Sequence, residues 1–197
     1  MIGCTAMDNI NFELIVEENI EQCRDLCNEL MAFQKSKAIM FPEAFNSMNF
    51  ETRLLQSFKN SPINQIIVAK DGENPVGYVF STVEDVKKGD KSSFPAWMPD
   101  IDTDAKGFYP DWEYFPDKIG CLNHLYVKKE YRRLSLGAKL LDKALAWLES
   151  FEDVDITFVY ISNGNTAAFD FYLQKGFTYS HEVFGGFIKA FYRPHTN

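Results

Sequence analysis

The sequence contains little of what marks a secreted, membrane-spanning or metal-binding chain. Its four cysteines, Cys4, Cys23, Cys27 and Cys121, include no CxxC pair, so no cysteine metal site or redox motif is indicated. Cys23 and Cys27 are expected to lie in a core. No stretch approaches the ~18 apolar residues of a membrane span, and the opening MIGCTAMDN has no hydrophobic signal segment. We therefore expect a soluble cytoplasmic protein without a metal.

Positive charge is also scarce. The chain has 20 lysines and arginines against 28 aspartates and glutamates, which gives a net charge of −8. This balance argues against nucleic acid and anionic membranes as general partners. It fits a cationic substrate, although acidic soluble proteins are common and the charge by itself favours neither interpretation. With 197 residues, 46% of them hydrophobic, the chain is long enough for one domain over residues 1–197 with its own core.

The hydrophobic pattern predicts a fold of the α/β (α+β) class. Strands are indicated at 12–16, in a hairpin over 65–84 that turns at 71–74, at 121–127, at 156–162 and in the closing segment 176–192. Helices are indicated at 19–33, at 47–59, from the stretch 130–141 to about residue 150, and at 165–175. The last third therefore alternates strand and helix, an order that places two parallel strands beside a helix start.

Residues 85–118 interrupt this pattern with a long segment rich in acidic and aromatic residues. Its acidic residues between Pro99 and Asp117 face one lysine, Lys106; they are Asp100, Asp102, Asp104, Asp111, Glu113 and Asp117. Its aromatic residues are Trp97, Phe108, Tyr109, Trp112, Tyr114 and Phe115. Such a wall would attract a cation through charge and cation–π contacts. Equally, the aromatic side chains could pin a solvated loop to the body of the protein, and both interpretations stay open.

The stretch EYRRLSLGAKLL, residues 130–141, places three small residues at the start of a predicted helix. Ser135, Gly137 and Ala138 leave backbone N–H groups accessible, and N–H groups at a helix start bind phosphate. The stretch is neither a GxxxxGK[ST] loop nor a GxGxxG fingerprint. It predicts a phosphate-binding turn of another kind, with Ser135 at a place where glycine is often found.

A second motif follows the predicted strand ITFVYIS. Its members have the spacing N-x-x-A-x-x-x-Y-x-x-x-G-F and are Asn165, Ala168, Tyr172, Gly176 and Phe177. Asn165 suits the N-cap of the predicted helix, and Gly176 suits its C′ position.

Together the two motifs resemble those of the GNAT superfamily of acyl-CoA N-acyltransferases. The first motif of that superfamily is a strand ending in valine, followed by [Q/R]-x-x-G-x-[G/A]. These places are held here by Val127, Arg132, Ser135 and Gly137. The second motif matches at every position, and the resemblance covers residues 121–177. It implies a single domain with a mixed, mostly antiparallel central sheet, a parallel pair of splayed strands and flanking helices.

The resemblance implies acetyl-CoA as a co-substrate and no metal. The strand 122–127 would pair with the pantetheine arm, and the amides of 133–138 would surround the pyrophosphate. The residues implied in binding are Leu125, Tyr126, Val127, Arg132, Arg133, Leu134, Ser135, Leu136, Gly137, Ala138, Asn165 and Ala168.

Two points about the phosphate turn stay open. Arg132 and Arg133 either add positive charge for the phosphate or are simply solvated. If the φ angle of Ser135 is positive, serine costs roughly 1–2 kcal/mol there relative to glycine. If that angle is negative, serine is a good N-cap and only its amide need face the phosphate.

The resemblance makes Tyr172 the general acid that protonates the departing CoA thiolate. Because a phenol titrates near ~10 and a thiol near ~8.5, full proton transfer is uphill by roughly 2 kcal/mol. Hydrogen bonding to the thiolate is therefore the larger contribution. The alternative is a tyrosine that only packs against the next strand.

The general base is missing from its usual place. Many relatives carry a glutamate four residues before the valine that ends the strand, and that residue here is Asn123. His124 titrates in a useful range and is a candidate. Adjacent strand residues face opposite ways, however, and a core or surface histidine is the competing interpretation. Acids of the segment 85–118, or ordered water, are the other candidates.

We expect the protein to transfer an acetyl group from acetyl-CoA to a primary amine by direct attack in a ternary complex. The acceptor is either a small cationic amine or an amine of a peptide or protein. Neither nucleic acid nor a membrane is an expected partner, and a homodimer stays open. The alternative is an acyl-CoA-binding or sensing module of the same fold without turnover.

Overall fold

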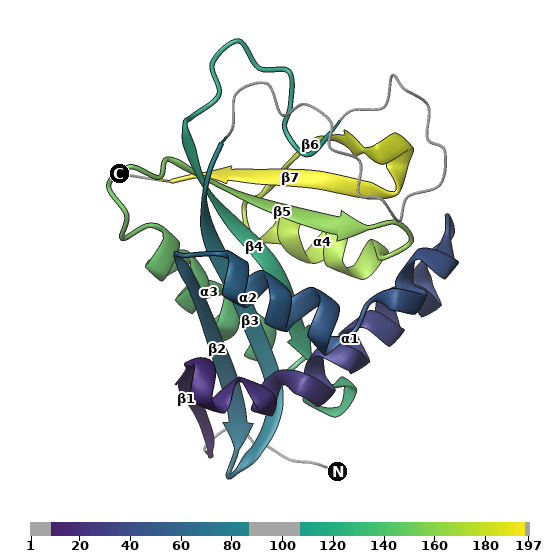
Figure 1. Cartoon of the computed structure of the whole chain (residues 1–197), viewed down its shortest axis with the longest axis vertical. Helices are drawn as coiled ribbons and strands as arrows, with labels where there is room; N and C mark the ends of the chain where they lie inside the picture. The colour runs from purple at the N-terminus through teal and green to yellow at the C-terminus, as the bar shows by residue number, and fades with distance from the viewer. Residues whose placement is uncertain (1–8, 87–106, 196–197) are drawn as a thin grey trace.

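Seven strands form one mixed sheet in the computed structural model, which describes residues 9–86 and 107–195 (Figure 1). The strands are β1 (Ile10–Ile15), β2 (Asn64–Asp71), β3 (Asn74–Asp85), β4 (Lys118–Val127), β5 (Ile156–Ser162), β6 (Thr178–Val183) and β7 (Ile188–Pro194). Their order is β1-β2-β3-β4-β5-β7-β6, and neighbours are antiparallel except for β4 and β5. The predicted fold class is confirmed.

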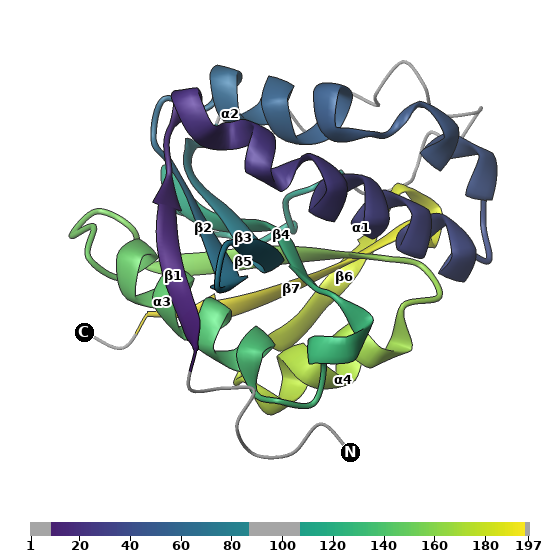
Figure 2. The ribbon, with the colours of Figure 1, turned by 90° about the horizontal axis from the view of Figure 1, so that it is seen from below.

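Helices cover both faces of the sheet (Figure 2). One face carries α1 (Arg24–Lys37) and α2 (Gln56–Asn60), and the other carries α3 (Leu136–Leu148) and α4 (Thr166–Gln174). Alternate residues of β3 serve the two faces, since Tyr78 packs with the α1 core and Val79 with the α3 core. Double coverage explains why every residue of β3 from Val76 to Val83 is buried. None of the helices in the described ranges is long and apolar enough to cross a membrane.

The helical segments between β1 and β2 differ from the two regular helices that the sequence predicts at 19–33 and 47–59. Only part of each stretch is α-helical. The remainder forms a 3₁₀ helix, which is wound more tightly than an α-helix, or a π-helix, which is wider. Ahead of α1 lies a 3₁₀ helix, η1 (Glu17–Cys23), and ahead of α2 lie a 3₁₀ helix, η2 (Pro42–Ser47), and a π-helical segment, η3 (Phe50–Leu55).

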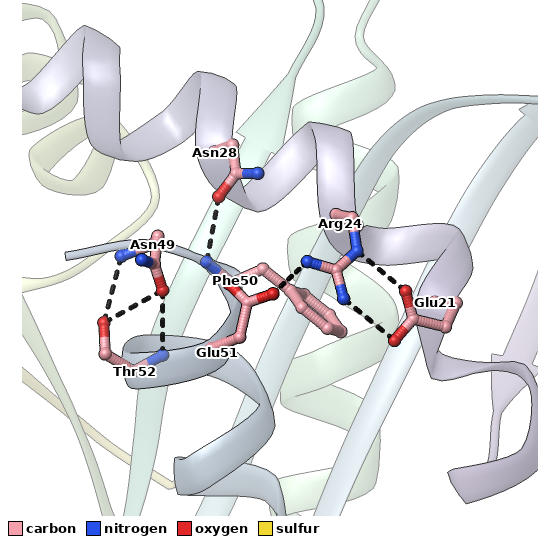
Figure 3. A network of polar contacts seen from close by, with 7 residues as sticks. All are labelled: Glu21, Arg24, Asn28, Asn49, Phe50, Glu51 and Thr52. Atoms are coloured by element: carbon pink, nitrogen blue, oxygen red, sulfur yellow. Dashed lines mark hydrogen bonds and ion pairs between the residues drawn. The ribbon is translucent and has the colours of Figure 1, made fainter.

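Polar contacts tie η3 to α1 (Figure 3). Oδ1 of Asn49 accepts the N–H of Thr52 at 3.0 Å and so caps the start of η3. On α1, Oδ1 of Asn28 accepts the N–H of Phe50 at 2.9 Å. Arg24 completes the network by forming ion pairs with both Glu21 and Glu51. The result is a fixed π-helical segment, a rare form that often lies at functional sites.

The parallel strands β4 and β5 pair over a short distance and then separate. Gly120 to Leu122 pair with Thr157 to Val159, and the two strands make no pairing beyond these residues. Figure 1 shows the two strands running apart from there. The edge of β4 that faces β5 is therefore left with unpaired backbone groups, as the predicted splay requires.

Aromatic side chains pack the described end of the segment 85–118, residues 107–117, against the sheet. The ring centroids of Trp112 and Tyr192 lie 4.9 Å apart, and those of Phe108 and Tyr160 lie 5.1 Å apart. For this end the structure supports the interpretation in which aromatic side chains pin the segment. The cation-attracting interpretation also rests on residues outside the described ranges, namely Trp97, Asp100, Asp102, Asp104 and Lys106.

Candidate functional site

The turn before α3 is shaped to bind an anion. Arg133 and Ser135 have positive φ angles of 66° and 60°, whereas Leu134 between them does not, and such alternation gathers successive N–H groups into one concavity. The N–H of Lys139 makes the first helical bond, to the carbonyl of Ser135 at 3.0 Å. The N–H groups of residues 136–138 therefore have no partner within the helix. With the positive end of the helix dipole, these amides suit a phosphate.

Ser135 is, with Arg133, one of two residues of this turn whose left-handed backbone is strained. Its φ of 60° and ψ of 7° are left-handed, and its side chain makes no capping hydrogen bond. Of the two possibilities for Ser135, the positive φ applies, and its cost is roughly 1–2 kcal/mol relative to glycine. Space beside the neighbouring Gly137 is open, because a Cβ built there would meet only Cγ2 of Val127, at 3.9 Å, among the described atoms.

Arg132 braces the end of β4. Its Nε donates to the carbonyl of Val127 at 2.8 Å, and its guanidinium lies 4.8 Å from the ring centre of Phe33 and 5.4 Å from that of Tyr126. Arg133 is exposed and is the arginine whose charge is available beside the turn. The two arginines therefore differ in their surroundings: Arg132 is packed against the end of β4, and Arg133 is exposed beside the turn.

Most side chains of the implied binding residues on β4 and at the start of α3 are packed away. The phenol of Tyr126 donates to Glu29 at 3.1 Å, and burial, with that bond, raises the pKa of Tyr126 to about 12. Leu125, Val127 and Leu136 pack in the core beneath α3. At these positions a ligand would meet the backbone, and β4 offers its free edge beyond the splay.

The second motif builds α4 as the sequence predicts. Oδ1 of Asn165 accepts the N–H of Ala168 at 3.3 Å, which caps the helix start. Gly176 ends the helix with a φ of 81°. The N–H of Phe177 donates to the carbonyl of Tyr172 at 3.0 Å, the long bond of a Schellman C-cap. The predicted N-cap and C′ positions are confirmed.

Tyr172 lies in the core between α4 and the sheet. Its ring meets that of Phe177 edge-on at a centroid distance of 5.3 Å. It belongs to the same core cluster as Leu122 and Val159, the last paired residues before β4 and β5 separate. Burial raises the pKa of the Tyr172 phenol, so the hydroxyl keeps its proton at neutral pH. A protonated hydroxyl is the state that hydrogen bonding to a thiolate requires.

A pocket of about 450 Å³ opens on the α1 face, where β4 and β5 separate. Its walls come from the helical segments α1, η2, η3 and α2, the ends of β3 and β5, the middle of β4, the segment at 108–109 and the residues that lead into β7. Polar side chains that line it include Gln34, Arg53, Glu84, Asn123, His124 and Ser162. Within the described residues, no three His, Cys, Asp or Glu side chains gather into a metal-binding group.

A bulge in β4 turns both Asn123 and His124 toward this pocket. Phe80 of β3 pairs with His124 and Ser81 pairs with Leu122, so Asn123 has no partner across the ladder. The prediction that the two neighbours face opposite ways assumes a regular strand and is wrong here. The extra residue of the bulge resets the alternation.

His124 is poorly suited to the role of general base. The side chain is buried, and its Nδ1 lies 2.9 Å from the hydroxyl of Tyr78. Burial and the positive charge of Arg53 lower the pKa of His124 to about 3. The ring is therefore neutral at physiological pH and binds a proton too weakly to take one from an ammonium group. The structure favours the competing interpretation of a core histidine.

Glu84 is a pocket carboxylate that the sequence interpretation missed. Oγ1 of Thr82 accepts a hydrogen bond from Nδ2 of Asn123 at 2.8 Å and donates to Oε1 of Glu84 at 2.7 Å. Asn123, at the place where the GNAT resemblance expects a glutamate, is thus linked to a glutamate of the neighbouring strand. The sequence carried one signal for Glu84. Side chains alternate between the two faces of a strand, so Thr82 and Glu84 lie on the same face of β3 as Phe80.

Asn163 joins three segments of the chain, one of which carries the pocket residue Phe187. Its Oδ1 accepts the N–H groups of Ile39 and Met40 at 2.6 and 2.7 Å. Its Nδ2 donates to the carbonyl of Phe187 at 3.1 Å. The adjacent Gly164, with a φ of 77°, approaches α1 so closely that a Cβ would lie 1.9 Å from a carbonyl oxygen. The loop after α1 is thereby fixed to the end of β5.

A splayed parallel pair beside an anion-binding helix start, with a pocket at the splay, defines an acyltransferase-like site. The sequence model described as "Acetyltransferase (GNAT) family" matches residues 30–177. The chain therefore belongs to the GNAT acetyltransferase family. No curated protein sequence matches it.

Solved structures share the fold at low sequence identity. The PaiA N-acetyltransferase of Thermoplasma acidophilum in complex with coenzyme A has a TM-score of 0.63 and 15% identity, over 94% of this chain and 99% of that one. An acetyltransferase from Thermus thermophilus has a TM-score of 0.58 and 17% identity, over 95% and 97%. Arabidopsis thaliana Naa50 with the bisubstrate analogue CoA-Ac-MVNAL has a TM-score of 0.57 and 14% identity, over 94% and 98%.

Proposed function

We propose that the protein transfers an acetyl group from acetyl-CoA to a primary amine by direct attack in a ternary complex. The observation that carries the proposal is the placement of two complementary sites around one opening in the sheet. The anion-binding turn follows the end of β4, and the pocket of about 450 Å³ lies where β4 leaves β5. A donor held at the first and an acceptor held in the second would meet at the splay.

The donor site is built from backbone groups. The amides of 133–138 hold the pyrophosphate, with Arg133 adding charge, and the open space at Gly137 permits close approach. The free edge of β4 at 125–127 offers N–H and C=O groups to the pantetheine amides, as a sheet edge does to an added strand. The neighbours crystallised with coenzyme A or with a CoA bisubstrate analogue support this placement.

The acceptor must reach the thioester as a neutral amine. An alkyl ammonium with a pKa near ~10.4 is neutral in only about one molecule in a few thousand at pH 7. Glu84 lines the pocket and is held by Thr82. In the proposed reaction the ammonium group first loses one proton to solvent. The neutral nitrogen then forms the nitrogen–carbon bond, the carbon–sulfur bond breaks to release the CoA thiolate, and Glu84 receives the second proton that the nitrogen loses.

Tyr172 completes the proposed chemistry at the leaving group. It lies behind the last paired residues of β4 and β5, on the face opposite the pocket. Its hydroxyl would donate a hydrogen bond to the thiolate as the carbon–sulfur bond breaks, and this hydrogen bond strengthens as charge develops on sulfur.

An amine acceptor is a cation in solution, which fits the net charge of −8. Cytoplasmic location and a homodimer stay predictions.

Thiol release tests the proposal against the alternative of a binding module. Acetyl-CoA is incubated with the protein and a panel of primary amines, and free CoA and the acetylated amine are measured together. We expect both products to appear in equal amounts and to depend on the protein. Binding of acetyl-CoA with no thiol release above the protein-free rate, across the whole panel, would identify an acyl-CoA-binding module instead.

A further inference from the structure

Two opposite charges line the pocket, and neither has an ionic partner in the described structure. Arg53 comes from η3 and Glu84 from the end of β3. Across residues 9–86 and 107–195, neither side chain takes part in an ion pair, with the other or with any other group. Glu84 is held by the neutral hydroxyl of Thr82. Within these ranges, the pocket therefore presents one free cation and one free anion.

Two basic side chains of neighbouring elements are paired with carboxylates, whereas Arg53, in the described part of the chain, is not. Arg24 forms ion pairs with Glu21 and Glu51. On α2, Nζ of Lys59 lies 3.9 Å from Oε1 of Glu17. Arg53, by contrast, has no carboxylate partner among the described residues. Because η3 is tied to α1 by the network of Figure 3, the backbone that carries Arg53 is fixed beside the pocket.

The hydroxyl of Ser162 is a second, independent indication that the pocket binds a polar ligand. The residue is 8% exposed and lines the pocket, and its Oγ is a buried atom without a hydrogen-bond partner among the described residues. A buried hydroxyl without a partner costs free energy, so such groups in native structures are commonly satisfied by a ligand or water. Gln34 and Ser57 also line the pocket and can bond to oxygen atoms of a ligand.

We propose that the acceptor is a small zwitterion, a molecule that carries its primary amine together with a carboxylate or phosphate group. This inference rests on the proposed acetyl transfer and names its substrate class. The amine faces Glu84, and the anionic group pairs with the guanidinium of Arg53, whose planar donors match either anion. A volume of about 450 Å³ suits a small molecule. The unmodified backbone of a peptide acceptor has no charge for Arg53.

Matched acceptor pairs test this assignment. One pair is an amino acid and its primary amide, and the other is an aminoalkyl phosphate and the corresponding amino alcohol. We expect kcat/KM, measured by CoA release, to favour the charged member by at least about tenfold. Arg53→Met should lower this ratio by at least about tenfold relative to the parent, and Arg53→Lys should retain part of it. Lys59→Met removes a charge from adjacent α2 without touching the pocket and should leave the ratio unchanged.

The comparison of ratios separates the effect of Arg53 from the different basicity of the two amines in a pair. A parent protein that prefers the neutral member of both pairs would overturn the proposal, as would an Arg53→Met variant that keeps the parent ratio. Faster acetylation of a peptide with an acidic second residue than of either small zwitterion would also overturn it. If Arg53→Met fails to fold, the parent ratio and Arg53→Lys decide.

Failure of the proposed acetyl transfer is a different outcome and leaves the inference testable. If no amine releases CoA, the parent is titrated by calorimetry with the amino acid and with its amide, in the presence of CoA. The proposal expects the amino acid to bind more tightly by at least about tenfold. Equal affinities, or no binding of either molecule, would overturn it.

Discussion

Tyr78 and His124 share a buried hydrogen bond, with 2.9 Å between the phenol oxygen and Nδ1. Burial raises the pKa of Tyr78 well above its usual value, so the phenol keeps its proton. Burial and the positive charge of Arg53 lower the pKa of His124 to about 3, so the bond joins two neutral groups at physiological pH. The hydrogen bond links β3 to β4 on the face of the sheet that α1 covers, next to the bulge of β4.

The neutral state of His124 predicts a loss of stability in acid. A histidine of the unfolded chain titrates near ~6.5, whereas His124 in the folded protein titrates at about 3. Between these values the unfolded state binds more protons, so the free energy of unfolding falls by up to about 1.4 kcal/mol per pH unit from this group. The contribution is complete above pH ~6.5 and is lost as the pH falls toward about 3.

Urea unfolding of the parent and of His124→Asn across this pH range measures the effect. The asparagine keeps an acceptor for Tyr78 but does not titrate, so the variant should show a shallower fall in stability as the pH is lowered. Its stability at neutral pH serves as the reference point. The same slope in both proteins would show that His124 is not a buried neutral histidine.

Gly137→Asp should abolish the stabilisation of the fold by CoA. The carboxylate would enter the open space beside the turn and repel the pyrophosphate. Because a Cβ at Gly137 is 3.9 Å from its nearest described neighbour outside the turn, the variant should fold, and Gly137→Ala is the matched control. The melting temperature is measured with and without CoA. Equal rises in Gly137→Asp and in the parent would contradict the assignment of the turn.

Ser135→Gly should stabilise the protein, since the φ of 60° at this residue is strained for serine. Relief of the left-handed strain is partly offset by the greater freedom of glycine in the unfolded chain, which leaves a gain of about 0.5–1 kcal/mol. Ser135→Val, with a branched Cβ, should lose stability at the same position. A loss of more than about 1 kcal/mol in the glycine variant would show that the serine side chain has a stabilising contact.

Tyr172→Phe should slow catalysis while preserving the fold. The ring packs in the core and keeps its contact with Phe177, and only the hydroxyl is lost. If that hydroxyl stabilises the thiolate, kcat should fall by roughly 10²–10⁴, while KM for acetyl-CoA changes far less. Steady-state kinetics under conditions where chemistry limits turnover give both values. A variant that keeps more than about half of the parent kcat would exclude this role.

Glu84→Gln should lower kcat/KM for every amine by roughly 10² or more, because the amide cannot accept the proton released by the nitrogen. The variant can still accept the hydrogen bond from Thr82. Asp85→Asn, at an exposed neighbour, removes the same charge and should behave like the parent. Binding of CoA should be unchanged in both. Normal activity in Glu84→Gln would move the proton acceptor elsewhere.

Local signals predicted the parts of the structure that depend on neighbouring residues. The hairpin around residues 71–74 and the caps at Asn165 and Gly176 are short-range features, and the structure confirms them. The parallel pair of β4 and β5 also follows from the order of strands and helices, whereas their splay was implied by the resemblance to the GNAT superfamily. Capping, turn chemistry and hydrophobic periodicity act over a few residues, so the sequence displays them directly.

The pocket between β4 and β5 could not be predicted in the same way. Arg53 and Glu84 lie far from both motifs in the chain, and only the sheet and η3 bring them to one cavity. The expectation that Asn123 and His124 face opposite ways assumed regular alternation along the strand, and it failed because β4 has a bulge there. The bulge depends on how β3 pairs with β4. The strain at Ser135 likewise required the φ angle itself. Pairing register and left-handed angles result from tertiary contacts.

The bonds of Asn163 to residues 39–40 and to residue 187 have a consequence for protein synthesis. A chain still on the ribosome that ends near residue 150 contains α1, η3 and β4 but lacks the asparagine and the segment it holds. Contacts so distant in sequence form late, since the closure entropy of the long loop comes first. A nascent chain that ends before residue 163 therefore lacks the bonds that join residues 39–40 to residue 187 beside the pocket.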